Sequence, residues 1–261
     1  MTSRETAIYR VPTNQIIGPE PPRHIRTVGW ARVRVSIVIP ALNEEDSIGR
    51  VLDQIPYDRL PETEVIVVDN GSRDGTAEVA VRKGARVVYE PHKGYGVATR
   101  KGMSEAKGDI IVTMDADGGH WPGDLPKMVR PVEVGSYLAA LGVRIHSYPH
   151  GMRIRRFLGN VLLARFFNTL YRERLSDVQC GFRAIHRNAL AMLKLTEDGM
   201  QFTTELLIEL KEKRISILPV QVEQMATKRS HLKEVQDFAK HVTLMLRRFP
   251  GVRSARSLEA P

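Results

Sequence analysis

The sequence predicts an α/β fold with a mostly parallel central sheet covered by helices on both faces. Within residues 33–114, short apolar, β-branched runs alternate four times with helix-type patterns. Such close alternation is typical of parallel strands joined by crossover helices. The run at residues 110–114 is rich in β-branched residues and apolar except for Thr113, as expected of a strand buried on both faces. The loops that follow the strands should then share one rim of the sheet.

The expected strands are rich in β-branched residues and end at turn-forming residues. Pro40 should end the first of them, because proline cannot donate to a strand ladder. Four strands are expected in this part of the chain, at residues 33–39, 64–68, 85–89 and 110–114.

Three helices should connect these strands. Asn43 or Asp46 can cap the first helix, and the others should run from residue 76 to about 83 and from the glycine-rich segment at 94–96 to about 107. Helical spacing predicts an apolar face on the first helix, made of Ile48, Val51, Leu52 and Ile55.

The composition is that of an ordinary globular protein, with 261 residues, 42% of them hydrophobic and 26% charged. The one cysteine, Cys180, excludes an intramolecular disulfide and indicates a reducing compartment. No run approaches 18 apolar residues and residues 1–30 lack an apolar signal core, so we expect no membrane span and no signal peptide.

The chain is basic, with 39 Lys and Arg against 30 Asp and Glu and a net charge of +9. Nucleic acid, an anionic membrane surface and phosphorylated substrates all attract a basic protein. No helix-turn-helix, zinc-finger or RNA-binding signature is present. The sequence therefore favours a membrane surface or a phosphorylated substrate, and we expect no nucleic acid.

Two carboxylates follow the expected strand at residues 110–114. Asp115 and Asp117 are two residues apart, at the place where ligands bind in open α/β sheets. They form a hard oxygen ligand set that suits Mg²⁺ or Mn²⁺, ions that usually also bind substrate phosphates. The alternative is an acidic turn, since Asp and Gly are common turn formers.

The other rim loops suit a nucleotide. A glycine-rich loop at a helix N-terminus suits phosphate, and Lys93 adds charge. Glu44 and Asp69 would accept hydrogen bonds from a base or ribose. The alternative is a set of ordinary connecting loops. The spacing is that of neither a P-loop nor a dinucleotide fingerprint.

Three motifs resemble family 2 glycosyltransferases with the GT-A fold. They are Ser-Ile-Val-Ile-Pro-Ala-Leu-Asn-Glu-Glu at 36–45, Val-Val-Asp-Asn-Gly-Ser-Arg-Asp-Gly-Thr at 67–76 and Met-Asp-Ala-Asp at 114–117. Residues 176–184 and 199–205 resemble the branch of dolichyl-phosphate mannosyltransferase and related polyprenyl-phosphate glycosyltransferases. The resemblance covers about residues 33–249.

For the donor, the resemblance implies a nucleotide-sugar site with a divalent cation, Mg²⁺ or Mn²⁺, held by Asp115 and Asp117. Leu42 stands where an aromatic residue is common, and Gly119 where a Gln or another polar residue is often found. His120 would touch the metal shell or be structural. The implied donor contacts are Pro40, Leu42, Glu44, Asp69, Lys93, Asp115, Ala116 and Asp117.

For the acceptor, Arg144 on an expected strand at 138–144 would face the acceptor phosphate, with Arg155 or Arg156 as a second partner. The alternative is a solvated arginine on an edge strand. Lys228 and Arg229 would supply charge in a lid over the diphosphate. In that lid a usual Gly is replaced and His231 takes the place of a Lys.

Residues 177–183 would lie near the sugar or form the wall of the site, with Cys180 buried. Glu205 would contact the sugar or belong to the wall. Helices expected at 153–172 and 235–248 mix basic and apolar residues. They would lie in a membrane interface, or pack on the core with their basic faces in water.

The expected function is metal-dependent, inverting transfer of a sugar from a GDP-mannose- or UDP-glucose-type donor to a polyprenyl or dolichyl phosphate, with Asp117 and Arg144 as catalytic residues. The alternatives are a soluble or phosphorylated non-lipid acceptor, or a non-catalytic nucleotide-sugar-binding homologue. We expect a protein peripheral to the cytoplasmic face of an anionic membrane, with a membrane protein or a second copy as a further partner. The expected organisation is an irregular arm at 1–30, a single domain at 31–250 (nucleotide-binding half 31–130, acceptor half 131–250) and a tail at 251–261.

Overall fold

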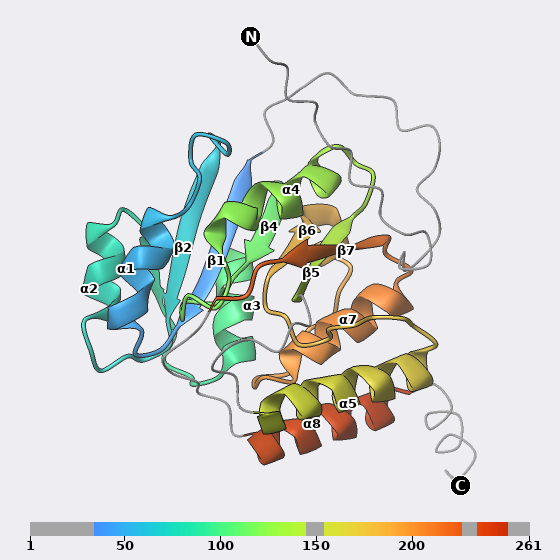
Figure 1. The fold of residues 1–261 in the computed structure, drawn as a ribbon. Coiled ribbons are helices and arrows are strands. Elements are labelled where there is room, and N and C mark those ends of the chain that lie inside the picture. Colours follow the sequence, from blue (N-terminus) through green and yellow to red (C-terminus); the bar gives the residue numbers. More distant parts are fainter. Residues whose placement is uncertain (1–33, 145–153, 226–233, 250–261) are drawn as a thin grey trace, which may run out of the picture.

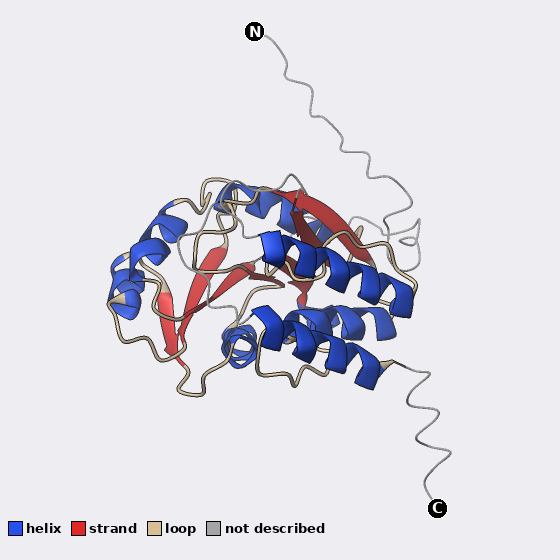
Figure 2. Ribbon diagram, turned by 60° about the horizontal axis from the view of Figure 1, so that its bottom comes forward, coloured by secondary structure: helices blue, strands red, loops and turns tan. Residues whose placement is uncertain are grey.

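A seven-stranded sheet forms the centre of the protein, with helices packed on both of its faces (Figures 1 and 2). The computed structural model describes residues 34–144, 154–225 and 234–249. The strand order is β3-β2-β1-β4-β6-β5-β7. Strand β6 is antiparallel to β4 and β5, and the other neighbouring pairs are parallel. The predicted α/β fold with a mostly parallel sheet is confirmed.

The first part of the sheet follows the predicted order of strands and helices. The four predicted strands and three predicted helices are all present, with each predicted end within about two residues of the observed one. These elements are β1 (Val35–Ala41), α1 (Glu45–Asp53), β2 (Thr63–Asp69), α2 (Thr76–Arg82), β3 (Arg86–Tyr89), α3 (Tyr95–Glu105) and β4 (Ile110–Thr113).

Pro40 does not end the first strand, and that prediction was wrong. Strand β1 continues to Ala41, with Pro40 opposite Val68 of β2. The Val38 carbonyl accepts from Met114 on the β4 side, and strand residues two apart face the same neighbour. The nitrogen of Pro40 therefore faces β4, whose pairing with β1 has ended at Thr113. A proline is tolerated there because no ladder bond is lost.

The predicted cap of α1 was also wrong. Glu44 occupies the cap position, without a side-chain cap hydrogen bond. Asn43 has a positive φ of 55°, and its Oδ1 accepts from the Arg73 amide at 2.8 Å. It therefore connects the loops after β1 and β2. The predicted apolar face is confirmed, since Ile48, Val51, Leu52 and Ile55 are all buried.

The second part of the chain completes the sheet and its helical cover. Strand β5 lies between β6 and β7, so it is an interior strand. The elements are η2 (Pro122–Asp124), α4 (Leu125–Glu133), β5 (Ala139–Arg144), α5 (Ile154–Tyr171), β6 (Arg183–His186), α6 (Arg187–Leu190), α7 (Phe202–Glu212), β7 (Ile217–Val222) and α8 (Glu234–Arg248).

Two apolar cores lie on opposite faces of the sheet. One core joins the strands to α1, α2 and α4, and the other joins them to α3, α5, α7 and α8. Successive residues of β1 alternate between the cores, with Ile37 in the first and Val38 in the second, as a strand covered on both faces requires.

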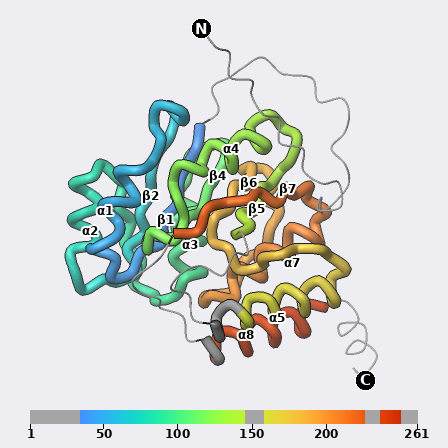
Figure 3. The backbone as a smooth tube through the Cα atoms, in the orientation of Figure 1, coloured from blue at the N-terminus to red at the C-terminus, as the bar shows by residue number. Residues whose placement is uncertain are grey.

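Helices α5 and α8 lie side by side over α7 (Figures 1 and 3). Each buries one face in the core, for example through Phe167 and Met245. Both helices therefore pack on the domain core, and contact of their outer faces with a membrane stays a prediction. Within residues 34–144, 154–225 and 234–249, no helix has both the length and the apolar character that a membrane span needs.

Candidate active site

The acidic pair lies where β4 ends, at the carboxyl rim of the parallel strands. Ala116 is buried between the two carboxylates, and the Asp115 side chain is 32% exposed. The Tyr95 hydroxyl donates to Asp115 Oδ1 at 3.1 Å, and the Gly119 amide donates to Asp117 Oδ1 at 2.8 Å. Both carboxylates are thus oriented by neighbours while remaining partly accessible to solvent.

Tyr95 and Gly181 shape the space around Asp115. Gly181 belongs to the segment 177–183 that was expected at the wall of the site, whereas no sequence pattern indicated a role for Tyr95. Burial and the neighbouring Asp115 carboxylate raise the pKa of the Tyr95 phenol well above its usual range, so it stays a donor. A Cβ on Gly181 would lie 2.5 Å from Asp115 Oδ1. Only glycine leaves room for the carboxylate in this position.

His120 and Cys180 are buried close to Asp115. Their Nε2 and Sγ atoms are 3.5 Å apart, and the His120 ring meets Phe182 edge to face at 5.4 Å. Burial, with a smaller contribution from the Arg144 charge, lowers the pKa of His120 to about 4. Burial raises the pKa of Cys180 to about 12. Cys180 is therefore a buried neutral thiol, as predicted, and is unsuited to act as a nucleophile.

The donor atoms at this rim fit a hard divalent cation that is shared with a substrate. Among the described residues, no group of three or more His, Cys, Asp or Glu side chains is placed to hold a metal by itself. Mg²⁺ typically takes one or two carboxylates and completes its shell with water and phosphate oxygens. Asp115 and Asp117 supply that number of carboxylates at a solvent-accessible edge.

The loops after β1 and β2 are joined to one another beside this pair. Glu44 is buried, its amide donates to Thr76 Oγ1 at 2.7 Å, and Ser47 Oγ donates to its Oε2 at 2.5 Å. Asp69 is also buried and accepts from the Ser72 amide at 3.0 Å. Pro40 and Leu42 are half-buried. The expected contact of these four residues with a nucleotide stays a prediction.

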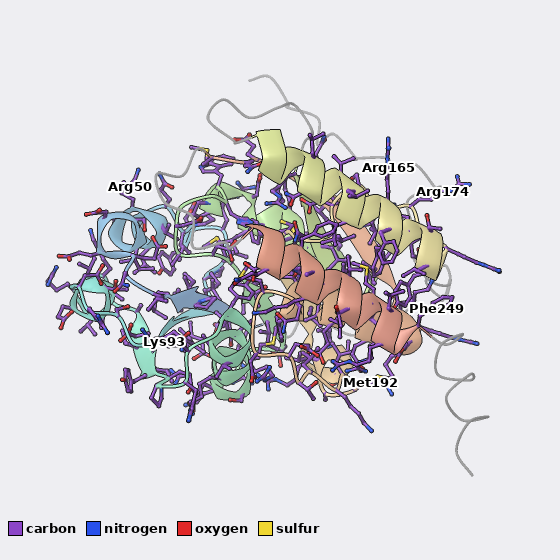
Figure 4. The ribbon with its side chains drawn as sticks, turned by 90° about the horizontal axis from the view of Figure 1, so that it is seen from below. Arg50, Lys93, Arg165, Arg174, Met192 and Phe249 are labelled. Atoms are coloured by element: carbon purple, nitrogen blue, oxygen red, sulfur yellow. The ribbon has the colours of Figure 1, made fainter. Side chains whose placement is uncertain are left out.

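The glycine-rich loop does not leave its helix N-terminus open for phosphate, so that part of the interpretation was wrong. The Gly96 and Val97 amides at the start of α3 both donate to the Asp198 carbonyl, at 2.8 and 3.3 Å. A Cβ on Gly94 would lie 2.3 Å from the same oxygen. The glycines allow two backbones to touch. Lys93 is exposed nearby (Figure 4), and its donor contact stays a prediction.

Arg144, at the end of β5, forms a two-point ion pair with Asp177. Its Nε lies 2.5 Å from Oδ2 and its Nη2 lies 2.9 Å from Oδ1, with side chains 13% and 3% exposed. Burial alone would raise the pKa of Asp177, but the Arg144 guanidinium outweighs it and lowers that pKa to about 2. The alternative of a solvated arginine on an edge strand was wrong. The acceptor role of Arg144 stays a prediction.

The remaining candidates separate into wall residues and residues outside the described ranges. Arg183 is buried and donates to the Cys180 and Thr203 carbonyls at 2.9 and 2.8 Å. Glu205 is fully buried and accepts from Arg248 at 2.9 Å, which favours the wall over the sugar. The side chains of Arg155 and Arg156, together with Lys228, Arg229 and His231, lie outside what the structure describes.

Comparison with known proteins agrees with this geometry. Residues 36–193 match the family model described as glycosyl transferase family 2. The low-salt glycan biosynthesis hexosyltransferase Agl6 of Haloferax volcanii is 32% identical over 230 residues, which cover 83% of this chain and 54% of Agl6. The dolichyl-phosphate hexose transferase of the same organism is 34% identical over 176 residues, 67% of this chain and 75% of that protein.

Among solved structures, glucosyl-3-phosphoglycerate synthase from Mycobacterium tuberculosis, in complex with Mn²⁺, UDP and phosphoglyceric acid, is similar with a TM-score of 0.71. It is 25% identical, and the match covers 87% of this chain and 85% of that one. The chain spans about half the length of Agl6 and three quarters of the dolichyl-phosphate enzyme. The chain belongs to glycosyl transferase family 2 and is a glycosyltransferase with the GT-A fold.

Proposed function

We propose that this family 2 glycosyltransferase moves a hexose from a nucleotide-diphosphate sugar to a polyprenyl or dolichyl phosphate, with inversion at the anomeric carbon. The observation that carries the proposal is the juxtaposition of an accessible carboxylate pair with a buried, oriented arginine. One short segment links the two sides, because Asp177 pairs with Arg144 and Gly181 lies against the Asp115 carboxylate. A donor diphosphate and an acceptor phosphate could thus be held on two sides of one site.

On the donor side, Asp115 and Asp117 would hold Mg²⁺ or Mn²⁺, which would neutralise the diphosphate as it leaves. The Tyr95 hydroxyl at 3.1 Å and the Gly119 amide at 2.8 Å fix the two carboxylates. A similar structure contains Mn²⁺ together with UDP, which supports this assignment of the donor side.

On the acceptor side, a phosphate oxygen would attack the anomeric carbon in line with the departing diphosphate. The new bond joins that oxygen to the anomeric carbon, and the bond from the carbon to the diphosphate oxygen breaks. A phosphate is already ionised at neutral pH, so no side chain has to remove a proton. Arg144 would bind the attacking group, held in place by Asp177.

A lipid acceptor is supported by the relative named for dolichyl phosphate and by the outer surface of α5 and α8. That surface exposes Leu158, Leu162 and Leu246 beside the basic Arg165 and Arg247. Arg165 projects from α5 in Figure 4. Apolar and basic side chains together suit an anionic membrane interface, so we place this surface against the membrane on its cytoplasmic side.

A second candidate is a small phosphorylated acceptor, favoured by the similar structure that holds phosphoglyceric acid. The two candidates share the donor and the chemistry of the attacking group. They differ in whether the acceptor carries a lipid chain, and an acceptor screen therefore separates them.

The test is release of nucleoside diphosphate from UDP- and GDP-hexoses with Mn²⁺ or Mg²⁺, using a short polyprenyl phosphate or 3-phosphoglycerate as acceptor. Transfer to the polyprenyl phosphate supports the lipid acceptor. Transfer to 3-phosphoglycerate alone establishes the second candidate. Activity with neither acceptor contradicts both.

Arg144→Ala should lower the rate with the acceptor by roughly 30- to 1000-fold, about 2–4 kcal/mol, while donor affinity changes little. Arg144→Lys should recover only part of the rate, because an ammonium cannot reproduce the planar fork. Donor affinity is measured by calorimetry and the rate at varied acceptor concentration. Weakened donor binding with an unchanged acceptor dependence would place Arg144 outside the acceptor site.

The protein should sediment with phosphatidylserine vesicles at low salt, and less so as salt screens the attraction. Arg165→Glu with Arg247→Glu should reduce sedimentation, while a control pair elsewhere, Arg50→Glu with Arg82→Glu on α1 and α2, should matter less. Equal loss in both pairs would show that net charge, rather than the α5–α8 surface, drives the attraction.

A further inference from the structure

One buried polar atom beside the acidic pair lacks a partner. Among the described residues, His120 Nδ1 is one of few buried side-chain nitrogens or oxygens without a hydrogen bond. It lies 3.8 Å from Asp115 Oδ2, which is too long for a hydrogen bond. A movement of less than about 1 Å would bring the two atoms within hydrogen-bond distance. Buried polar groups without partners are uncommon and call for an explanation.

The His120 ring cannot easily turn toward another partner. The backbone of His120 bridges Gln224, Phe182 packs against the ring edge to face, and Cys180 Sγ lies 3.5 Å from Nε2. His120 itself is only 4% exposed. These contacts hold Nδ1 toward Asp115.

The proton of the ring can be placed by electrostatics. His120 is almost fully buried, and burial disfavours the charged form of a histidine, so the neutral imidazole carries a single N–H. Burial also keeps the Cys180 thiol protonated. If Nε2 carried the proton, a bare Nδ1 lone pair would face a carboxylate. If Nδ1 carries it, the N–H dipole points at the carboxylate and the S–H can donate to Nε2.

We propose that Cys180 and His120 position the Asp115 carboxylate for the donor complex, through an Sγ–H to Nε2 contact and an Nδ1–H that donates to Oδ2. His120 is thus a positioning residue that acts through Asp115. Tyr95 orients the other oxygen, Oδ1, so both oxygens of one carboxylate would be set by neutral donors. The inference rests on the proposed role of Asp115 in holding the cation with the donor diphosphate.

Two isosteric variants test the inference through metal affinity. An Asn at position 120 places its amide near Nδ1 and can still donate to Asp115, whereas a Gln places its amide near Nε2 and cannot. With UDP present, His120→Gln should weaken Mn²⁺ binding about 10-fold or more, and His120→Asn should stay close to wild type. Mn²⁺ affinity is measured from the electron paramagnetic resonance signal of unbound Mn²⁺. Equal affinities of the two variants would overturn the inference.

A second buried histidine, His241 on α8, provides a matched control. His241 is 1% exposed and has partners on both nitrogens, Thr204 and Gln179. His241→Gln should lower thermal stability without changing Mn²⁺ affinity.

Two variants of Cys180 test the role of the sulfur. Cys180→Ser keeps a hydrogen-bond donor toward His120 Nε2, and Cys180→Ala removes it. Only the Ala variant should weaken Mn²⁺ binding.

The tautomer of His120 can be measured in the wild-type protein, without any substitution. Nitrogen-15 NMR of the metal-free protein should show the His120 proton on Nδ1, and a proton on Nε2 would overturn the inference even if a variant fails to fold. If wild-type protein binds no Mn²⁺ with UDP, the proposed metal site fails. The NMR result still decides how Cys180 and His120 are arranged.

Discussion

Two pairs of carboxylates in this protein have opposite environments. Asp115 and Asp117 lie at the solvent-accessible end of β4, where neutral donors orient them. Glu205 and Glu209 lie on α7, almost fully buried. One Arg248 guanidinium on α8 reaches both glutamates, at 2.9 and 2.8 Å. The first pair keeps exposed oxygen surface, and the second is neutralised within the fold.

The difference shows that an acidic motif does not by itself indicate a binding site. Glu205 also accepts from the Thr196 and Glu197 amides, at distances of 2.8–3.0 Å. A buried carboxylate with this many donors stabilises the fold only while all its partners remain. Glu205 and Glu209 therefore hold α8 and the loop before α7 against α7. Asp115 and Asp117, in contrast, are accessible to a ligand.

The largest expected effect contrasts the two pairs with isosteric changes. Asp117→Asn keeps an acceptor for the Gly119 amide but removes the charge, so transfer should fall by roughly 10²–10³-fold or more with little change in stability. Glu205→Gln should do the reverse, lowering stability while the activity of folded protein stays near wild type. Nucleoside diphosphate release and urea unfolding measure the two effects. Near-normal transfer by Asp117→Asn at saturating metal would contradict the metal site.

The next effect concerns the ion pairs that Arg248 of α8 forms with Glu205 and Glu209 of α7. Arg248→Ala leaves two buried glutamates without their cation, so the free energy of unfolding should fall by about 3–5 kcal/mol. Arg247 on the same turn pairs with Glu197 but is 57% exposed. Arg247→Ala should therefore cost less than about 1 kcal/mol. Similar losses in the two variants, measured by urea unfolding, would show that burial does not distinguish these pairs.

A smaller effect should make the α7–α8 contact sensitive to acid. Burial, and then the Arg183 charge, lower the pKa of His241 to about 4. The unfolded chain takes up this proton near pH 6.5 while the folded protein does not, so stability should fall as pH drops from about 6.5 to 4. The expected loss is on the order of 3 kcal/mol.

His241→Gln should remove this part of the pH dependence, and His92→Gln should not, because the His92 side chain is 85% exposed. Urea unfolding of the three proteins at several pH values between 4 and 7 provides the comparison. Parallel stability curves for wild type and His241→Gln would assign the acid sensitivity to other groups.

The sequence by itself determined the order of elements from β1 to β4 and the place of the acidic pair. Strand and helix patterns are local, because side-chain spacing along a few residues decides which face is apolar. Asp115 follows its strand directly in the chain, so its position at the rim required no knowledge of packing. The buried face of α1 at Ile48 and Val51 was predictable for the same reason.

Tertiary structure decided which of the polar and glycine residues serve the fold. Strand β6 enters antiparallel between β4 and β5, with Arg183 opposite both Thr113 and Leu141. This places the segment that precedes β6 beside both candidate sites, bringing Asp177 to Arg144 and Cys180 to His120. These pairs are 33 and 60 residues apart, and no local pattern encodes such a pairing.

The glycine-rich loop shows the same limit. Gly94 and Gly96 have the composition of a phosphate loop, yet the backbone of residues 197–198 occupies that space. A glycine permits close approach of any group, whether ligand or backbone. The residue type is written in the sequence, but the identity of the approaching group depends on contacts across about 100 residues, which only the folded chain brings together.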